Sequence, residues 1–184
     1  MTFAPRRTYI DTMLFVYQLA LRKTDMKNRL SSEFFRAVED GVYEGVITTF
    51  TYAEYIAVMK ETLSNRLGVR LSQTQLDSLR HEFESFVDKE GIEVLDADDL
   101  SSGLGRCEIF RWSSQVVETT GTVEGADHKW RTIGGADTLH VVLANRAGAE
   151  LLATFDEVFK VLDDLAAFGW SLKPLIIPEV YKRE

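Results

Sequence analysis

The stretch GGADTLHVVLANRAGAELLATFDEVF covers residues 134–159 and carries the clearest structural signals in the sequence. Residues 136–146 are apolar on nearly all sides over a length typical of a helix, which predicts a buried helix. Residues 150–154 have the composition of a strand, and Asp156 is in position to cap a helix over residues 157–168. A buried helix followed by a strand and a second helix indicates an α/β fold.

The rest of the chain continues this alternation. Further strands are predicted over residues 8–10, 45–50, 92–95 and 170–177, and further helices over residues 13–23, 32–40, 51–67, 73–89 and 99–117. Residues 119–135 are polar and predict a loop whose role the sequence does not tell. Because 184 residues suffice for one sizeable core, we expect a single domain over residues 1–184, an α/β/α sandwich around a central, mainly parallel sheet.

Three further helix starts carry capping signals. Ser31 or Ser32 is the expected N-cap of the second helix. Thr51 and Glu54 have the T-x-x-E spacing of a capping box, and Ser72 begins a second stretch with that pattern. If the first of these boxes forms, Glu54 has a purely structural role.

The composition narrows the class of protein. The net charge of −8, from 29 acidic and 21 basic residues, argues against a protein that coats nucleic acid electrostatically, but not against a nuclease with carboxylates around metal ions. The single cysteine excludes an internal disulfide framework and a cysteine-rich zinc site. No run approaches the roughly 20 apolar residues that span a bilayer, so we expect a cytoplasmic protein without membrane contact.

Four acidic residues fall where a parallel α/β fold gathers its ligands, beyond the carboxyl ends of the strands. Asp11 ends the first strand, Glu54 and Asp137 lie in expected first helical turns, and Asp156 follows the strand at residues 150–154. Carboxylate oxygens are ligands that Mg²⁺ and Mn²⁺ prefer, and such ions can promote phosphodiester hydrolysis. The competing interpretation is that each acid only caps a helix or favours its dipole, so metal binding is one option among several at this point.

The sequence gives less support to other kinds of catalytic or binding site. His140 lies on the apolar helix and is interpreted as a core histidine, and the remaining histidines lack zinc-ligand spacing. The chain has neither a P-loop nor a nucleophile elbow. A basic rim that could hold phosphates has its candidates near the N-terminus, although a solvated surface explains most of them equally well: Arg6, Arg7, Arg22, Lys23, Lys27 and Arg29.

Three segments resemble motifs of the PIN-domain family. YIDTMLFVY, from Tyr9, resembles the opening strand that ends in Asp, and TTFTYAEYIAVM, from Thr48, resembles the second motif with its helical Glu. The stretch 134–159 resembles the most specific part of the family, an Asp-bearing buried helix followed by a strand and T-x-D-x-x-F. The order and approximate spacing match across most of the chain.

The resemblance implies a PIN-like fold and metal-dependent endoribonuclease activity, with Mg²⁺ or Mn²⁺ as cofactor and RNA as substrate. Asp11, Glu54, Asp137 and Asp156 occupy the positions of the family's catalytic and metal-binding acids, with Thr12 and Thr154 as supporting groups. In the VapC-like branch such enzymes are toxins that pair with an antitoxin protein, which makes a cognate antitoxin the expected partner. A homodimer is also left open.

Two departures from the family pattern limit this inference. Met13 stands where the family often has Asn or Ser, and the segment between Leu95 and Asp137 is long. The substrate preference of family members therefore cannot be transferred to this chain. Two alternatives stay open beside the toxin: an RNA-processing PIN nuclease, and a catalytically silent PIN module that binds RNA or protein.

Overall fold

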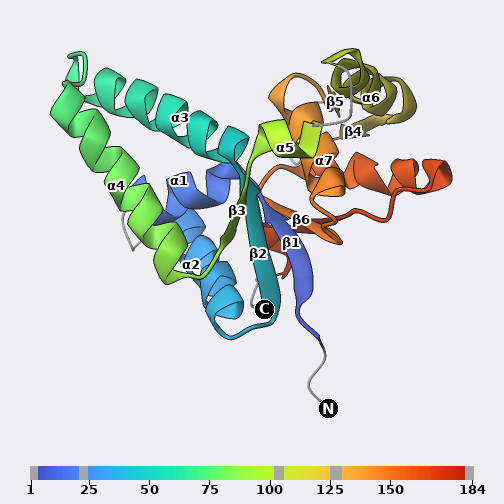
Figure 1. Ribbon diagram of the computed structural model, residues 1–184, viewed down its shortest axis with the longest axis horizontal. Helices are drawn as coiled ribbons and strands as arrows, with labels where there is room; N and C mark the ends of the chain where they lie inside the picture. The colour runs from blue at the N-terminus through green and yellow to red at the C-terminus, as the bar shows by residue number, and fades with distance from the viewer. Residues whose placement is uncertain (1–3, 21–24, 102–105, 125–129, 181–184) are drawn as a thin grey trace.

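A five-stranded parallel sheet forms the centre of the protein (Figure 1). The computed structural model describes residues 4–20, 25–101, 106–124 and 130–180. The strands of this sheet follow the order β3-β2-β1-β6-β7. Their bounds are β1 Arg6–Ile10, β2 Tyr43–Thr48, β3 Glu93–Leu95, β6 Leu151–Thr154 and β7 Lys173–Ile176.

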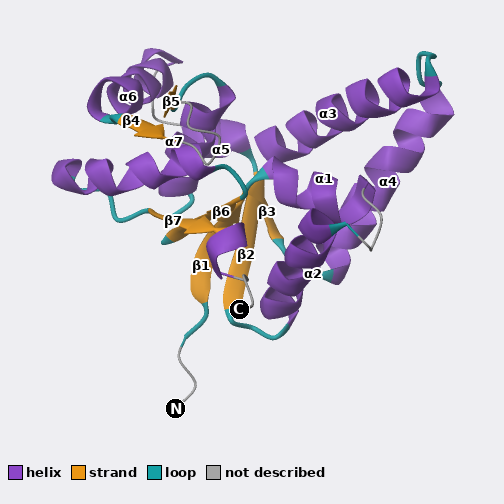
Figure 2. Cartoon of the chain, turned by 180° about the vertical axis from the view of Figure 1, so that it is seen from behind, coloured by secondary structure: helices purple, strands orange, loops and turns teal. Residues whose placement is uncertain are grey.

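Helices cover both faces of the sheet (Figure 2). On one face lie α1 Thr12–Ala20, α2 Met26–Glu39, α3 Thr49–Leu67 and α4 Gln73–Lys89. The other elements are α5 Ala97–Ser101, α6 Arg106–Thr119, β4 Thr122–Glu124, β5 Trp130–Thr132, α7 Ala136–Arg146, the 3₁₀ helix η1 Glu157–Phe168 and α8 Ile177–Val180. Of these, α6, α7 and η1 pack on the opposite face, which confirms the predicted α/β sandwich.

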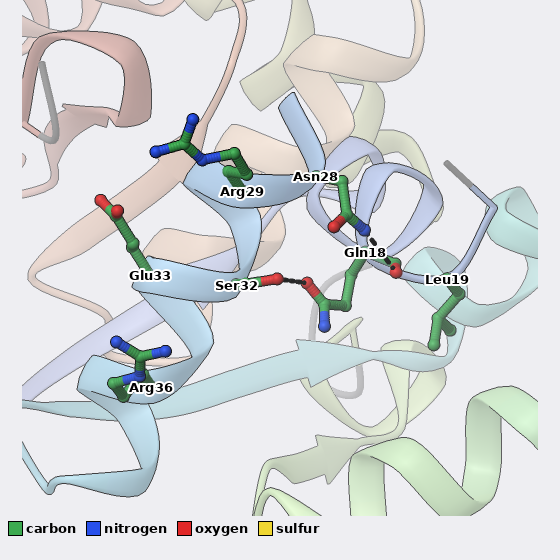
Figure 3. Close-up of a pocket in the computed structure, with 7 residues that line it drawn as sticks. All are labelled: Gln18, Leu19, Asn28, Arg29, Ser32, Glu33 and Arg36. Carbon is green, nitrogen blue, oxygen red and sulfur yellow. Dashed lines mark hydrogen bonds between the residues drawn. The ribbon is translucent and has the colours of Figure 1, made fainter. Parts of the chain in front are cut away.

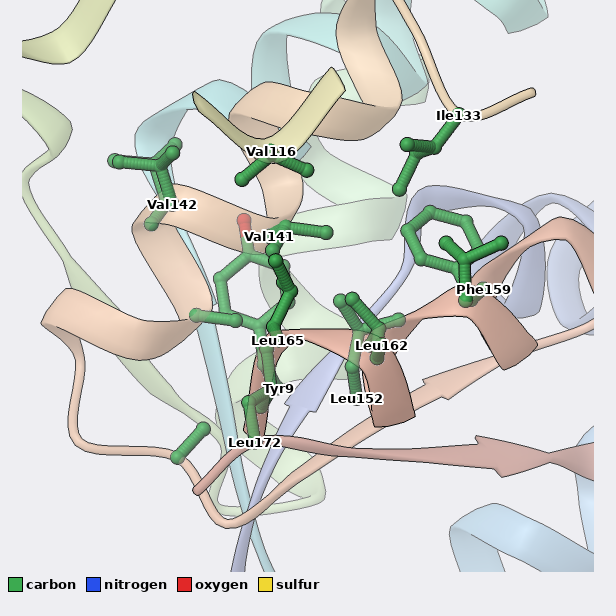
Figure 4. Close-up of a cluster of buried hydrophobic side chains, with 14 of the residues drawn as sticks. Tyr9, Val116, Ile133, Val141, Val142, Leu152, Phe159, Leu162, Leu165 and Leu172 are labelled. Carbon is green, nitrogen blue, oxygen red and sulfur yellow. The ribbon is translucent and has the colours of Figure 1, made fainter. Parts of the chain in front are cut away.

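Strand β1 separates two apolar cores because neighbouring side chains of a strand point to opposite faces. Tyr9 contributes to the core under α7 and η1, and Ile10 to the core under α1 to α4. Figure 4 shows the first core, where Val141 of α7, Leu152 of β6 and Leu162 of η1 converge. Tyr9 and Ile10 are both fully buried, as expected in the central strand of a parallel sheet.

The strand order places a topological switch point beside β1. The chain runs from β1 outward to β2 and β3, and then returns to add β6 and β7 on the other side of β1. At such a point the crossovers leave on opposite faces, and a crevice opens beyond the carboxyl ends of the two strands. Asp11 and Asp156 both follow strands that end at this crevice.

Several local predictions are confirmed. Helix α7 has the predicted bounds Ala136–Arg146. Ser72 forms a complete capping box with Gln75 at the start of α4. The Asp156 carboxylate accepts a hydrogen bond from the backbone N–H of Val158 at 2.9 Å and so caps η1, although the turns that follow are 3₁₀ turns.

Other local predictions are wrong. The N-cap of α2 is Asp25 rather than Ser31 or Ser32, so this helix begins well before the predicted start. The carboxylate of Asp25 is as good a cap as a serine hydroxyl, and good helix formers follow it. The polar segment 119–135 contains the antiparallel strands β4 and β5, and the predicted helix 99–117 is divided between α5 and α6, with residues 102–105 outside the described part.

The predicted capping box of Thr51 and Glu54 does not form. Helix α3 begins at Thr49 with Thr48 as its N-cap, and no side chain caps it. Both residues therefore lie within the helix, where Thr51 is fully buried. Glu54 is free of the structural role that its spacing suggested.

Candidate metal centre

Three side chains meet at the carboxyl edge of the sheet. Asp11 follows β1, Glu54 lies in the second turn of α3, and His140 lies in α7. Each offers one potential ligand atom, and these atoms all lie within 4.8 Å of one another. Two carboxylates and one imidazole form a donor set that suits a divalent cation, since two negative charges balance the charge of the ion.

Glu54 is held by two hydrogen bonds. Its Oε2 atom lies 2.7 Å from Nε2 of His140 and accepts a hydrogen bond from the hydroxyl of Thr12. Partial burial would raise the pKa of the Glu54 carboxyl, but these hydrogen bonds and the charge of His140 outweigh it, and the pKa is lowered. Glu54 is therefore ionised at neutral pH and available as a ligand.

Asp11 is the most deeply placed acid of the centre, with 7% of its surface exposed. Its Oδ2 atom accepts a hydrogen bond of 2.7 Å from the hydroxyl of Thr154, whose oxygen in turn accepts one from the backbone N–H of Asp156. Burial nevertheless raises the pKa of Asp11 above its ordinary value, with a further contribution from the charge of Glu54. Because burial disfavours the ionised form of this carboxylate, a bound cation would stabilise it.

The His140 ring is fixed from both sides. Nε2 faces Glu54, and Nδ1 lies 3.2 Å from the hydroxyl of Tyr9, which also contacts Thr48 and Thr51. Burial raises the pKa of Tyr9 to about 12, so this hydroxyl stays protonated. It can donate to a threonine while accepting from Nδ1–H, which leaves the Nε2 lone pair for a metal.

A proton on Nε2 of His140 would compete with a metal ion for this nitrogen. Burial lowers the pKa of the imidazole, but the hydrogen bond with Glu54 and the charge of Asp11 outweigh burial and raise it. A cation at Nε2 would displace a proton held between this nitrogen and Glu54, whose atoms lie 2.7 Å apart. Metal binding would therefore release a proton.

Asp137 and Asp156 stand beside this group but supply none of its mutually close ligand atoms. Asp137 lies one helical turn before His140 in α7, on the same side of the helix. Burial and the charges of Asp11 and Asp156 raise the pKa of Asp137 to about 6. The carboxylate of Asp156 caps η1 and lies 3.9 Å from the guanidinium of Arg131.

The structure thus brings together two of the four predicted acids, Asp11 and Glu54, and places Asp137 within range of their charges and of the charge of Asp156. Metal binding by these four residues stays a prediction. The histidine that sequence reasoning interpreted as a core residue is fully buried, as expected, yet it faces both of the grouped carboxylates. Its position three residues after Asp137 was the one signal that could have included His140 in the site.

Only part of the predicted basic rim approaches this edge. Arg6 and Arg7 lie at the start of β1, at the opposite edge of the sheet, where Arg7 pairs with Glu44 and Glu93. Arg22 and Lys23 lie outside the described residues. Arg29 lines a hollow of about 540 Å³ at the end of α1 away from Asp11, where polar side chains such as Ser32 and Gln18 bind each other (Figure 3). Lys27 lies in a groove next to Asp156.

Within the described residues, no helix is both long and apolar enough to cross a lipid bilayer. No protein-family model matches the chain, and no curated protein is significantly similar to it in sequence.

Proposed function

We propose that the protein is a divalent-metal-dependent ribonuclease of the PIN type that hydrolyses RNA phosphodiester bonds. The observation that carries this proposal is the grouping of Asp11, Glu54 and His140 at the switch point of the sheet, with Asp137 beside them. A group of carboxylates at the carboxyl edge is the requirement of a metal-dependent hydrolase. The three sequence segments that resemble PIN motifs supply the family and the substrate class.

The donor set favours Mn²⁺ over Mg²⁺. Asp11 and Glu54 would supply oxygens to either ion, but imidazole nitrogen is a softer ligand that Mg²⁺ rarely accepts. A bound cation would supply polarisation of the phosphate and a lowered pKa for water in the site. The chain's own groups already set the geometry for it, because Thr12 orients Glu54 and Thr154 orients Asp11.

Asp137 is placed for a different task. It is less buried than Asp11, and its carboxyl has a pKa of about 6, near the range in which a general base works best. We assign to its carboxylate the orientation of the attacking water and the acceptance of its proton. Asp156, next to the groove that holds Lys27, would complete the negative charge around the centre.

The proposal includes a toxin role with a cognate antitoxin protein, which rests on the resemblance to the VapC-like branch. The geometry of the metal centre supports an RNA-processing nuclease equally well. It disfavours a silent binding module, because removing Asp11, His140 and part of Glu54 from water costs folding energy that a binding surface does not require.

The direct test is cleavage of a labelled single-stranded RNA with Mn²⁺, Mg²⁺ or EDTA present. Cleavage should need metal and be faster with Mn²⁺. Asp11→Asn and Glu54→Gln should each reduce it by more than the roughly 10- to 100-fold that losing an outer partner of a metal ligand costs. Asp163→Asn is the matched control, because Asp163 lies on η1 and pairs with Lys173 of β7 rather than with a residue of the site. Cleavage in EDTA, or full activity in both site variants, would contradict the proposal.

A further inference from the structure

A groove of about 620 Å³ reaches the neighbourhood of the candidate metal centre at Asp156. It lies between α1, α2 and the segment that follows β6, and Asp156 forms part of its wall. The side chains that matter for its chemistry are Met13, Tyr17, Lys27, Arg131, Phe155 and Asp156. This volume lies within the range of roughly 300–1,000 Å³ that small-molecule sites occupy.

Aromatic and flexible apolar groups line the groove. The rings of Tyr17 and Phe155 meet edge to face, with centroids 4.8 Å apart. Met13 and Met26 lie next to them, and Met26 is 61% exposed. The accessible parts of such aromatic and methionine side chains offer flat, polarisable surface to a ligand ring.

Two cations flank this surface. The Lys27 ammonium lies 4.5 Å from the centroid of the Tyr17 ring and donates a hydrogen bond of 2.9 Å to the Tyr17 hydroxyl. Arg131 reaches the groove from β5 and pairs with Asp156 at 3.9 Å. A ligand that combines a flat ring with negative charge would satisfy both features.

We infer that this groove binds one nucleotide of single-stranded RNA next to the phosphate that the metal centre cleaves. The inference rests on the proposed function and extends it to the form of the substrate. The base packs against Tyr17 and Phe155, and Lys27 contacts the adjoining phosphate. A duplex keeps its bases stacked inside, so the groove selects an unpaired nucleotide. Arg131 joins the phosphate contacts from its place beside Asp156.

The position of Asp156 supports this occupant over an apolar peptide. The residue belongs both to the groove wall and to the acids around the metal centre, so a chain entering the groove leads directly to the reacting edge. The carboxylates of Asp156 and Glu157 would repel a phosphate on their own. Lys27 and Arg131 offset that repulsion, a compensation that an uncharged peptide would not need.

The test measures binding separately from cleavage. A labelled eight-nucleotide single-stranded RNA is titrated by fluorescence anisotropy with Mn²⁺, in an Asp137→Asn background in which RNA is expected to stay intact. Adding Tyr17→Leu should raise Kd about 10-fold, within the range measured for loss of one base stack. Adding Lys27→Gln should make the negative slope of log affinity against log salt shallower by about 0.7, as loss of one phosphate contact requires.

Matched controls separate stacking from folding. Tyr43→Leu removes a similarly half-buried ring that stacks on Phe34 at the far edge of the sheet, and Lys60→Gln removes an exposed lysine of α3. Both should leave Kd and its salt slope unchanged. Tyr17→Phe keeps the ring and should bind like the background protein, which separates the ring from its hydroxyl. The Lys27→Gln salt slope preserves the test if Tyr17→Leu is poorly folded.

Each outcome has a distinct meaning. If neither Tyr17→Leu nor Lys27→Gln alters RNA binding, the groove inference is wrong even when the protein cleaves RNA. If Tyr17→Leu abolishes binding of a purified protein partner while RNA binding is unchanged, the groove belongs to that partner and the inference is overturned. If wild-type protein shows no metal-dependent cleavage, the proposed function fails, whatever the groove binds.

Discussion

Replacing Asp137 by asparagine should stabilise the metal-free protein at neutral pH while it abolishes cleavage. In the folded protein, burial and the charges of Asp11 and Asp156 raise the pKa of Asp137 from 3.8 to about 6. Above that pH the ionised carboxylate is a burden on the folded state, because the unfolded chain carries the same charge in water. Asparagine keeps the size of the side chain and removes this burden.

The magnitude follows from the pKa. Each tenfold change in proton affinity is worth about 1.4 kcal/mol, so the rise from 3.8 to about 6 sets an upper limit of about 3 kcal/mol. Solvent reaches part of the side chain and should reduce this by roughly half. Asparagine also forfeits an attraction of about 0.5 kcal/mol to the N-terminus of α7. The net gain is about 1 kcal/mol, or about 2–4 °C in Tm for a domain of this size.

The raised pKa also determines how the stability difference between the wild type and Asp137→Asn changes with pH. Between pH 3.8 and about 6 the folded state of the wild type binds more protons than the unfolded state, so its stability falls as the pH rises through this window. The variant lacks this group. Its advantage should be absent below pH 4, grow up to about pH 6 and stay constant above.

Thermal unfolding in EDTA across this pH range is the assay, with Asp163→Asn as the control. Saturating Mn²⁺ should reverse the order, because the wild type gains about 2.7 kcal/mol from a ligand at 100 times its Kd and the variant gains less. A variant that is less stable than the wild type at pH 7.5 in EDTA, with an unchanged control, would refute the charge-repulsion reasoning.

Two further predictions concern groups next to the site, and a third concerns the toxin role. Asp156→Asn keeps the cap of η1 but removes a charge, so cleavage should need more Mn²⁺, recover partly at high Mn²⁺ and fall less than in Asp11→Asn or Asp137→Asn. Glu157→Gln should cleave like the wild type. The reverse pattern in Mn²⁺ titrations of the cleavage rate would exclude Asp156 from the site. Thr154→Val removes the hydroxyl that donates to Asp11. It should lower the free energy of unfolding by about 1–3 kcal/mol and the Mn²⁺ affinity about 10-fold. An unchanged Mn²⁺ affinity would show that this hydroxyl does not orient Asp11. Expression of the protein alone should arrest growth and co-expression of the adjacent small gene product should restore it, whereas normal growth with a soluble, active nuclease would remove the toxin role.

The sequence predicts the sheet and its edge well because those signals are local. The strand that ends at Asp11 and the largely apolar helix from Ala136 to Arg146 are set by composition and spacing alone. Parallel strands then place the residues that follow them at one edge, which is why Asp11 and Asp156 could be expected there.

The rest of the candidate site depends on contacts between distant segments. His140 lies on an apolar helix face, and nothing in its neighbours distinguishes a histidine among core residues from one that faces two carboxylates. Glu54 carried a capping-box spacing that tertiary structure overrode, since β2 runs directly into α3 at Thr48. The pairing of Tyr17 with Phe155 joins the beginning and the end of the chain, and no local pattern predicts it.

The most direct test of the metal centre is calorimetric titration of the metal-free protein with Mn²⁺, carried out in two buffers of different ionisation enthalpy. Wild-type protein should bind Mn²⁺ more tightly than Mg²⁺ and release a proton as it does so. Asp11→Asn, Glu54→Gln and His140→Gln should each weaken Mn²⁺ binding by at least about 10-fold, and His140→Gln should also abolish the proton release and narrow the preference for Mn²⁺. Equal Mn²⁺ affinity in the wild type and all three variants would contradict the assignment of Asp11, Glu54 and His140 as a metal centre.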